Sequence, residues 1–276
     1  MGLNPKDAFI RMLRIVVLLY IGFAIYAWFF SDHVIFLPHP SSYADGTGIV
    51  KLLSANGSMI SALYLPNPSA KYTMLVSHGN AEDLGDDRYW LEGLRDAGFS
   101  VFAYDYQGYG TSQGKPSEKS AYDDENAAYD YLVSNLKIAP EHIIVFGRSV
   151  GSGPAVNLAA RQPVGALILQ SPFVSAFRVV TRIPLLPFDK FPNYKHMGQV
   201  RCPLLIIHGT NDTVVNIWHG RMLFDLANEP KQFFAVPGAD HNDLDMVAGE
   251  NYGKTIHLFA ESLTSANASR MPGTSR

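Results

Sequence analysis

The residues best suited to chemistry in this sequence lie in one short stretch, Gly147 to Gly151, which has the pattern G-x-S-x-G. The stretch follows an apolar, β-branched run, Ile143–Phe146, and precedes residues that favour a helix. Glycines on both sides allow a sharp turn between a strand and a helix, and such a turn exposes the hydroxyl of the central Ser149. We predict that Ser149 is a nucleophile for a carbonyl carbon.

A serine hydroxyl reacts readily only when a base takes its proton, and the base needs a carboxylate to orient it. His241 and Asp212 each follow a strand-like run in the second half of the chain. The carboxyl ends of parallel strands meet at one edge of a sheet, so residues that follow different strands can converge there. We therefore predict a Ser149–His241–Asp212 triad. Asp243 is the alternative carboxylate, although it lies only two residues from His241.

The transition state of acyl transfer also needs N–H donors for its oxyanion. We expect one from the backbone of Val150, at the start of the helix, and one from Asn80, in the turn after an earlier strand. His78 and His208 each precede a glycine at a strand end, and we interpret both as structural. Arg148 has two interpretations, a contact to an anionic substrate or a salt bridge.

Composition excludes several other classes of function. The net charge of −3 gives no reason to expect a nucleic-acid partner. Cys202 is the only cysteine, so a disulfide within the chain, a cysteine-rich zinc site and a CxxC redox pair are impossible. The chain has no HExxH motif, and its glycine-rich turns fit neither the phosphate-loop nor the dinucleotide pattern. We expect no metal and no organic cofactor.

Hydrophobic patterning predicts an α/β fold. Continuous apolar runs alternate with amphipathic segments, which is typical of a parallel sheet covered by helices on both faces. Asn56-Gly57 separates two strand-like runs and predicts a hairpin at one edge of the sheet. The expected strands are 49–55, 59–65, 72–77, 100–104, 143–146, 166–169, 204–207 and 232–236, and the expected helices are 87–97, 121–136, 153–160, 217–226 and 252–263.

The N-terminal segment predicts a membrane span. Ile15 to Phe30 contains no charged residue and would be about 24 Å long as a helix. Including Met12 and Leu13, with Arg14 reaching the interface, extends it to about 28 Å, close to the hydrocarbon thickness of a bilayer. We therefore predict a transmembrane anchor at residues 12–30.

Charges on either side of this segment predict its orientation. Lys6, Arg11 and Arg14 precede it, while Asp32 and Asp45 follow it. The positive-inside rule places residues 1–11 in the cytoplasm and the rest of the chain on the extracytoplasmic (periplasmic or lumenal) side. A cleaved signal peptide and a core or interfacial helix are the alternatives.

We divide the remainder into a linker at 31–48, an α/β domain at 49–264 and a flexible tail at 265–276. Within the domain, residues 174–203 break the alternation with several prolines and many apolar side chains. A long loop of this kind is usually functional, and we interpret it as a cap over the site that receives a lipophilic group. The alternative is that the segment only packs on the domain. The candidate substrate-binding residues are Phe173, Phe177, Leu185, Leu186 and Phe188.

Several motifs together resemble the α/β-hydrolase superfamily: SHGNAEDLG, YDYQGYGTSQGKPSE, GRSVGSGPAVNLA, IIHGTNDTVV, FDKFPN and PGADHNDL. The resemblance spans about Leu52 to Phe259 and is greatest to membrane-associated serine hydrolases related to the bud-emergence protein and to the Ras depalmitoylating thioesterases. It implies an eight-stranded, mostly parallel sheet and the same three catalytic residues. Those thioesterases reach membranes through palmitoylated cysteines, whereas here no cysteine precedes Cys202.

The sequence thus predicts a membrane-anchored serine hydrolase for esters or thioesters of lipophilic acyl groups, with a lipid or another acyl ester as its substrate. An amidase or peptidase with the same triad is one alternative, because the surroundings of a triad decide its substrate. A non-catalytic membrane scaffold on a hydrolase fold is another. The oligomeric state is left open.

Overall fold

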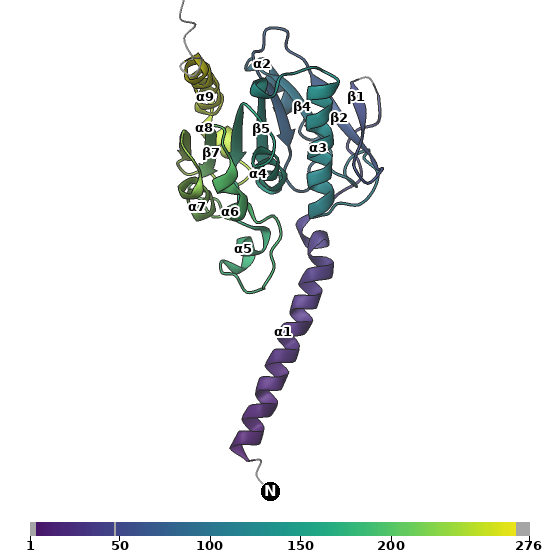
Figure 1. Ribbon diagram of the computed structural model, residues 1–276, viewed down its shortest axis with the longest axis vertical. Helices are drawn as coiled ribbons and strands as arrows, with labels where there is room; N and C mark the ends of the chain where they lie inside the picture. Colours follow the sequence, from purple (N-terminus) through teal and green to yellow (C-terminus); the bar gives the residue numbers. More distant parts are fainter. Residues whose placement is uncertain (1–3, 47, 269–276) are drawn as a thin grey trace, which may run out of the picture.

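The computed structural model describes residues 4–46 and 48–268. An eight-stranded sheet in the order β1-β2-β4-β3-β5-β6-β7-β8 forms the centre of the globular part, and the helix α1 (Pro5–Ile35) projects from it (Figure 1). Strands β3 to β8 pair in parallel, while β2 pairs antiparallel with both β1 and β4. The predicted mostly parallel eight-stranded sheet is confirmed.

Helices cover both faces of the sheet because successive side chains of a buried strand point to opposite faces. On β3, Leu75 joins the core layer that contains α3 and α4, whereas Met74 and Val76 join the layer that contains α2 and α9. All five residues of β3 are buried. This two-sided burial explains the unbroken apolar runs of the central strands.

The predicted hairpin forms the edge of the sheet. Leu53 pairs with Met59 next to the turn, and Gly57 has a φ of +87°, a conformation that favours glycine. The strand β1 (Ile49–Leu53) is two residues shorter than the expected run.

The other expected elements lie where the sequence places them, with ends that differ by up to three residues, except that α9 ends five residues later than expected. Their bounds are β2 Met59–Leu65, β3 Thr73–Ser77, α2 Arg88–Asp96, β4 Ser100–Tyr104, α3 Glu118–Ser134, β5 Ile143–Arg148, α4 Ser152–Ala159, β6 Ala166–Gln170, β7 Leu204–Gly209, α7 Trp218–Leu226, β8 Lys231–Val236 and α9 Glu250–Ala268. Three further α-helices were not expected: α5 Ala176–Thr181, α6 Asn193–His196 and α8 Leu244–Ala248.

Two of these short helices lie within the segment expected to be a long loop, 174–203. Arg182 ends α5 in the left-handed region, with a φ of +60°, and Pro192 precedes α6. Pro184 follows shortly after α5. Because both helices are short and prolines stand beside them, helical periodicity is not visible in the sequence there.

Two predicted boundaries differ from the structure. The helix α1 extends past residue 30 to Ile35, so the first five residues of the predicted 31–48 linker are helical. Asn4 caps its first turn and Pro5 occupies the first helical position, while the next proline is Pro38. The helix α9 continues to Ala268 because its last residues include neither glycine nor proline. The rest of the predicted tail, 269–276, lies outside the described residues.

Candidate active site

The end of β5 places Ser149 at a strained turn. Ser149 has a φ of +50°, which non-glycine residues rarely adopt. The two flanking glycines leave no room for a side chain: a Cβ on Gly147 would lie 2.6 Å from the Gly151 carbonyl oxygen, and one on Gly151 would lie 2.0 Å from that of Ser77. The turn therefore packs directly against the end of β3 and presents Ser149 above the sheet edge.

The loops after β7 and β8 bring two further predicted residues to Ser149. The Nε2 atom of His241 lies 2.9 Å from the Ser149 Oγ, and its Nδ1 atom lies 2.8 Å from Asp212 Oδ2. With the Nδ1–H donating to the carboxylate, Nε2 is free to accept the serine proton. The three residues form the hydrogen-bonded chain expected from the sequence.

Asp212 is held as a carboxylate by its surroundings. Its Oδ1 atom accepts hydrogen bonds from the backbone N–H groups of Val214 and Val215, at 3.0 and 2.7 Å. Burial by itself would raise the pKa of this carboxyl, but the contacts from His208 and His241 and the Val215 N–H outweigh burial and lower the pKa below its ordinary value. A charged Asp212 suits the stabilisation of an imidazolium.

The alternative candidates do not contact Ser149. Asp243 Oδ1 instead accepts a hydrogen bond from the backbone N–H of Asp240, at 2.7 Å. The Nε2 atom of His208 lies 2.7 Å from the Val215 carbonyl oxygen, and His78 is buried beside Asp105. His208 thus contacts a loop carbonyl and His78 a buried carboxylate, as expected for structural histidines.

The two expected oxyanion donors line the same cavity as Ser149. Val150 follows the serine directly. Asn80 is anchored through its side chain, whose Oδ1 accepts hydrogen bonds from the Leu37 N–H at 2.9 Å and the Tyr109 hydroxyl at 3.0 Å. Leu37, two residues beyond the end of α1, therefore helps to position the loop that carries Asn80.

A buried carboxyl lies beneath the site, on α3. Glu125 Oε1 accepts the hydroxyl hydrogen of Ser77 at 2.9 Å, and its Oε2 has no hydrogen-bond partner among the described residues. Burial raises the pKa of Glu125 to about 8. Glu125 is therefore a neutral acid at pH 7 and supports the end of β3, against which Gly151 packs.

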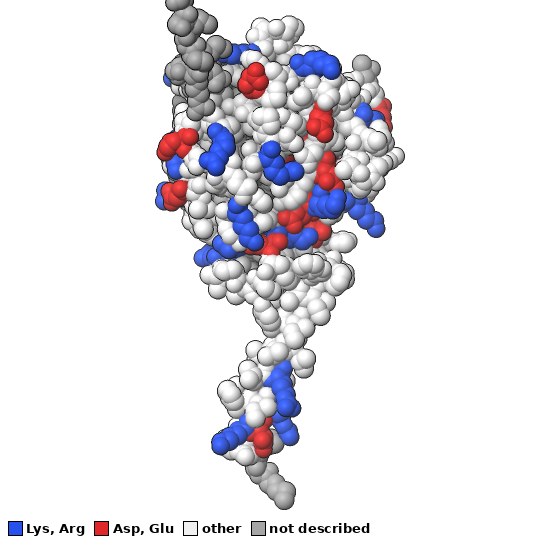
Figure 2. All heavy atoms as spheres, viewed as in Figure 1, with Lys and Arg blue, Asp and Glu red and all other residues white. Residues whose placement is uncertain are grey.

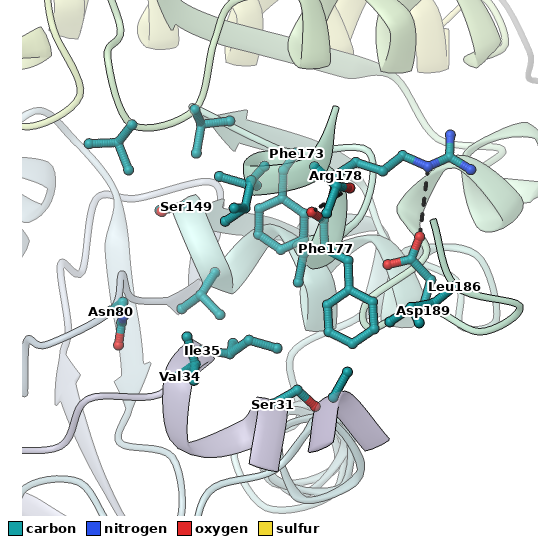
Figure 3. A pocket seen from close by; sticks show the side chains of 18 of the residues that line it. Ser31, Val34, Ile35, Asn80, Ser149, Phe173, Phe177, Arg178, Leu186 and Asp189 are labelled. Atoms are coloured by element: carbon teal, nitrogen blue, oxygen red, sulfur yellow. Dashed lines mark hydrogen bonds and ion pairs between the residues drawn. The ribbon is translucent and has the colours of Figure 1, made fainter. Parts of the chain in front are cut away.

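The site opens into an apolar cavity of about 520 Å³ (Figure 3). Ser149 and His241 lie on its wall, and all five candidate substrate-binding residues line it, four from the cap segment and Phe173 directly before it. Two of them pack edge to face: the Phe177 and Phe188 ring centroids are 5.9 Å apart and the ring planes meet at 72°. The cavity is thus continuous from the serine hydroxyl to the aromatic cap.

The opposite wall comes from α1, which sequence reasoning assigned to anchoring alone. Figure 3 shows the end of α1 facing the cap across the cavity. Spacings of three and four residues place its lining residues on one helix face. No sequence signal separates this face, because α1 is apolar on every side from residue 15 to residue 30. The lining residues of α1 are Phe23, Tyr26, Ala27, Ser31, Val34 and Ile35.

Each acidic side chain that lines the described cavity is paired with an arginine. The Arg148 guanidinium lies 3.1 Å from Glu82, and Arg178 lies 3.7 Å from Asp189. For Arg148, the salt-bridge interpretation is the one that the structure supports. The cavity thus offers a substrate an apolar surface and neutralised charges.

One group of possible metal ligands lies in the loops near the site: His39, Asp83 and Asp86, whose ligand atoms are within 4.8 Å of one another. The Asp83 carboxylate is already occupied by hydrogen bonds from the N–H groups of Ser42 and Gly85, at 2.8 and 2.9 Å. The closeness of these three side chains is thus explained by the hydrogen bonds that hold the loop.

Comparisons with known proteins identify the family of this chain. The family described as "Serine aminopeptidase, S33" matches residues 68–188, which include Ser149 but end before Asp212. "Alpha/beta hydrolase domain-containing protein 17B" of Xenopus tropicalis is 40% identical over 215 residues, 76% of this chain and 73% of that protein. The human protein of the same name is 42% identical over 197 residues, 70% of this chain and 68% of that protein.

Solved structures share the fold. The Pyrococcus furiosus esterase Pf2001 superposes with a TM-score of 0.69 over 82% of this chain and 99% of its own, at 19% identity. The Paleococcus ferrophilus monoacylglycerol lipase superposes with a TM-score of 0.60 over 74% of this chain and 99% of its own, at 20% identity. The chain belongs to the α/β-hydrolase superfamily, in the family of the α/β-hydrolase domain-containing 17 proteins, and it is a hydrolase.

Proposed function

We propose that this hydrolase cleaves carboxylic esters or thioesters of lipophilic acyl groups through a Ser149–His241–Asp212 triad. The observation that carries the proposal is the pair of contacts at His241, 2.9 Å to the Ser149 Oγ and 2.8 Å to Asp212, at the wall of an apolar cavity. A reactive hydroxyl and an apolar binding surface are the two requirements for such a substrate.

The reaction follows from this geometry. His241 Nε2 takes the proton of Ser149 as its Oγ attacks the acyl carbon, and the backbone N–H groups of Val150 and Asn80 stabilise the oxyanion. His241 then returns the proton to the leaving alcohol or thiol, which leaves an acyl-Ser149 ester. Water, deprotonated by His241, hydrolyses this ester and releases the acid. Asp212 orients His241 and stabilises its charged form.

The cavity supports a lipophilic acyl group more than a peptide. An aminopeptidase, the activity named in the family description, requires a group that holds the substrate ammonium, usually a carboxylate. Both acids of the described cavity lining, Glu82 and Asp189, are paired with arginines. Phe177 and Phe188 offer aromatic surface where an acyl chain would lie.

The helix α1 supports membrane anchoring. It is the one helix in the described residues that is long and apolar enough to cross a bilayer, and no residue of its most apolar 18-residue window is buried. With Lys6, Arg11 and Arg14 at its start, we propose a cytoplasmic N-terminus and a hydrolase domain on the extracytoplasmic side. There, lipids or other acyl esters of that leaflet are the available substrates.

A fluorophosphonate probe tests the catalytic proposal on the purified full chain. Labelling is expected in the wild type, absent in Ser149→Ala and strongly reduced in His241→Ala. Equal labelling of Ser149→Ala would refute the role of this serine.

A series of p-nitrophenyl esters, with a peptide p-nitroanilide beside it, tests the substrate class. Phe177→Ala is expected to lower kcat/KM for long-chain esters by about 10- to 100-fold, because the apolar contact is lost, and to leave short-chain esters nearly unchanged. Faster cleavage of the anilide than of any ester would favour the amidase alternative.

A further inference from the structure

Two apolar segments that are far apart in the sequence pack together where α1 leaves the globular part. One is α1, and the other is the cap tip, which we define as residues 179–188. The Trp28 ring meets the Phe188 ring edge to face at 5.0 Å, and the Tyr20 hydroxyl donates a hydrogen bond to the Leu185 carbonyl oxygen at 3.0 Å. The cap tip therefore follows α1 for at least eight residues, about 12 Å of helix.

Charged residues end both segments at the same level. On α1 the uncharged run ends at Asp32, and on the cap it ends at Asp189 and Lys190. Lys190 lies 2.9 Å from Asp32, and Arg178, at the other end of the cap tip, lies 3.7 Å from Asp189. These two ion pairs form a charged rim. On the face in Figure 2, the surface below the rim lacks coloured Lys, Arg, Asp and Glu atoms until the N-terminal part of α1.

The uncharged length of α1 matches a bilayer. Arg14 and Asp32 are about 27 Å apart along the helix, close to a hydrocarbon thickness of about 30 Å. Tyr20 lies about 18 Å from Asp32. A bilayer placed around this part of α1 therefore also contains the cap tip, since Leu185 contacts Tyr20.

The cap tip is suited to a lipid environment. Val180, Ile183 and Leu185 are all exposed, at 83%, 58% and 48%. Its single charged residue is Arg182, and a long arginine side chain can extend from an apolar layer toward the polar interface.

Non-helical backbone is tolerated in hydrocarbon only when its polar groups are satisfied. The two prolines of the cap tip, Pro184 and Pro187, have no N–H. Tyr20 satisfies the Leu185 carbonyl, and the Thr181 hydroxyl donates to the Ile183 carbonyl at 2.7 Å.

The cavity crosses the rim between these two segments. At one end it is lined by Ser149 and His241, and at the other by Phe23 and Tyr26 of α1. Phe23 lies about 14 Å beyond Asp32 along α1. One continuous apolar space thus joins the reactive serine to the region that a bilayer would occupy.

We propose that the cap tip inserts into the bilayer beside α1, and that the acyl chain of a membrane-resident ester enters the cavity between them, directly from the bilayer. The chain stays in an apolar environment while its ester carbonyl reaches Ser149 above the charged rim. In this arrangement α1 is a wall of the substrate site as well as an anchor. The inference deepens the proposed function and rests on it for the identity of the ester.

Fluorescence on the full chain in phosphatidylcholine vesicles tests the insertion. In a Cys202→Ala background, an environment-sensitive dye is attached at Ile183→Cys in the cap tip or, as the control, at Met246→Cys on α8, a residue that is 76% exposed. The Ile183 dye is expected to show blue-shifted emission and quenching by nitroxide-labelled lipid. The Met246 dye is expected to be quenched by aqueous iodide. A dye at Ile183 that iodide quenches as strongly as the control would overturn the insertion.

A matched pair of charge variants tests delivery from the bilayer. Pro187→Asp adds a charge to the cap tip at a residue that does not line the cavity, and Met246→Asp adds one elsewhere. Pro187→Asp is expected to lower hydrolysis of a long-chain ester embedded in vesicles by about tenfold or more, because inserting an aspartate into hydrocarbon is unfavourable. Hydrolysis of water-soluble p-nitrophenyl acetate is expected to be unchanged in both variants.

The remaining outcomes separate the inference from the proposed function. Insertion of the Ile183 dye together with unchanged vesicle hydrolysis in Pro187→Asp would overturn entry from the bilayer. Failure of the wild type to hydrolyse any ester, p-nitrophenyl acetate included, would refute the esterase proposal while leaving the insertion result valid.

Discussion

The two regions that line the cavity are built in opposite ways. At the sheet edge, Ser149, His241 and Asp212 are joined by hydrogen bonds of 2.8 and 2.9 Å, and the glycine turn leaves no space for an added methyl group. The wall formed by α1 and the cap tip has exposed apolar side chains and few polar contacts.

The difference reflects two kinds of recognition. Proton transfer requires donors and acceptors at fixed distances, and only a buried, hydrogen-bonded framework holds them there. Contact with an acyl chain is non-directional and depends mainly on apolar area. Small substitutions should therefore lower activity or stability strongly at the sheet edge and only slightly on the apolar wall.

The largest expected effect is that of Asp212→Asn. The amide cannot hold His241 in the tautomer that accepts the serine proton, so kcat for p-nitrophenyl esters should fall by about 10⁴-fold. Asp243→Asn is the control, since Asp243 contacts the Asp240 N–H and not His241. Similar losses in the two variants would contradict the assignment of Asp212.

The same glycine substitution in the two regions gives the next largest contrast. Gly151→Ala would place a Cβ 2.0 Å from the Ser77 carbonyl oxygen, and we expect it to lower the free energy of unfolding by about 3 kcal/mol. Gly22→Ala on α1 meets nothing within 4 Å and should change stability by no more than about 1 kcal/mol. Thermal unfolding in detergent measures the stability of both variants. Equal shifts in Tm would contradict the expected difference between the sheet edge and α1.

A smaller, pH-dependent effect is expected from Glu125. Its pKa is raised by burial from an ordinary 4.5 to about 8, so between these values the folded protein holds a proton that the unfolded chain has lost. The free energy of unfolding should therefore fall as pH rises across this interval, by about 1 kcal/mol per pH unit from this group. Glu125→Gln keeps an acceptor for Ser77 and should flatten this dependence. Parallel curves of Tm against pH for wild type and variant would contradict it.

Much of the fold was predictable because its signals are local. The apolar runs of β3, β5 and β7 and the Asn56-Gly57 turn depend on residues that are neighbours in sequence. Element ends were less predictable, as at the end of α1 and within 174–203, because caps and tertiary packing decide where a helix stops.

The candidate triad could also be chosen from sequence, since a strand followed by a reactive residue places that residue at the sheet edge. The sequence favoured Asp212 over Asp243, because Asp243 is only two residues from His241, and in the structure it is Asp212 that contacts the imidazole.

Residue types and their order along the chain were enough to indicate the α/β architecture, the reactive serine and the apolar N-terminal helix, because each depends on local turn chemistry or on periodicity. Folding alone decided that one face of α1 and the cap tip enclose a single cavity with Ser149. When a helix is apolar on every side, its sequence does not indicate which face will pack against another segment of the chain. That choice arises only when residues more than a hundred positions apart, such as Tyr20 and Leu185, come into contact.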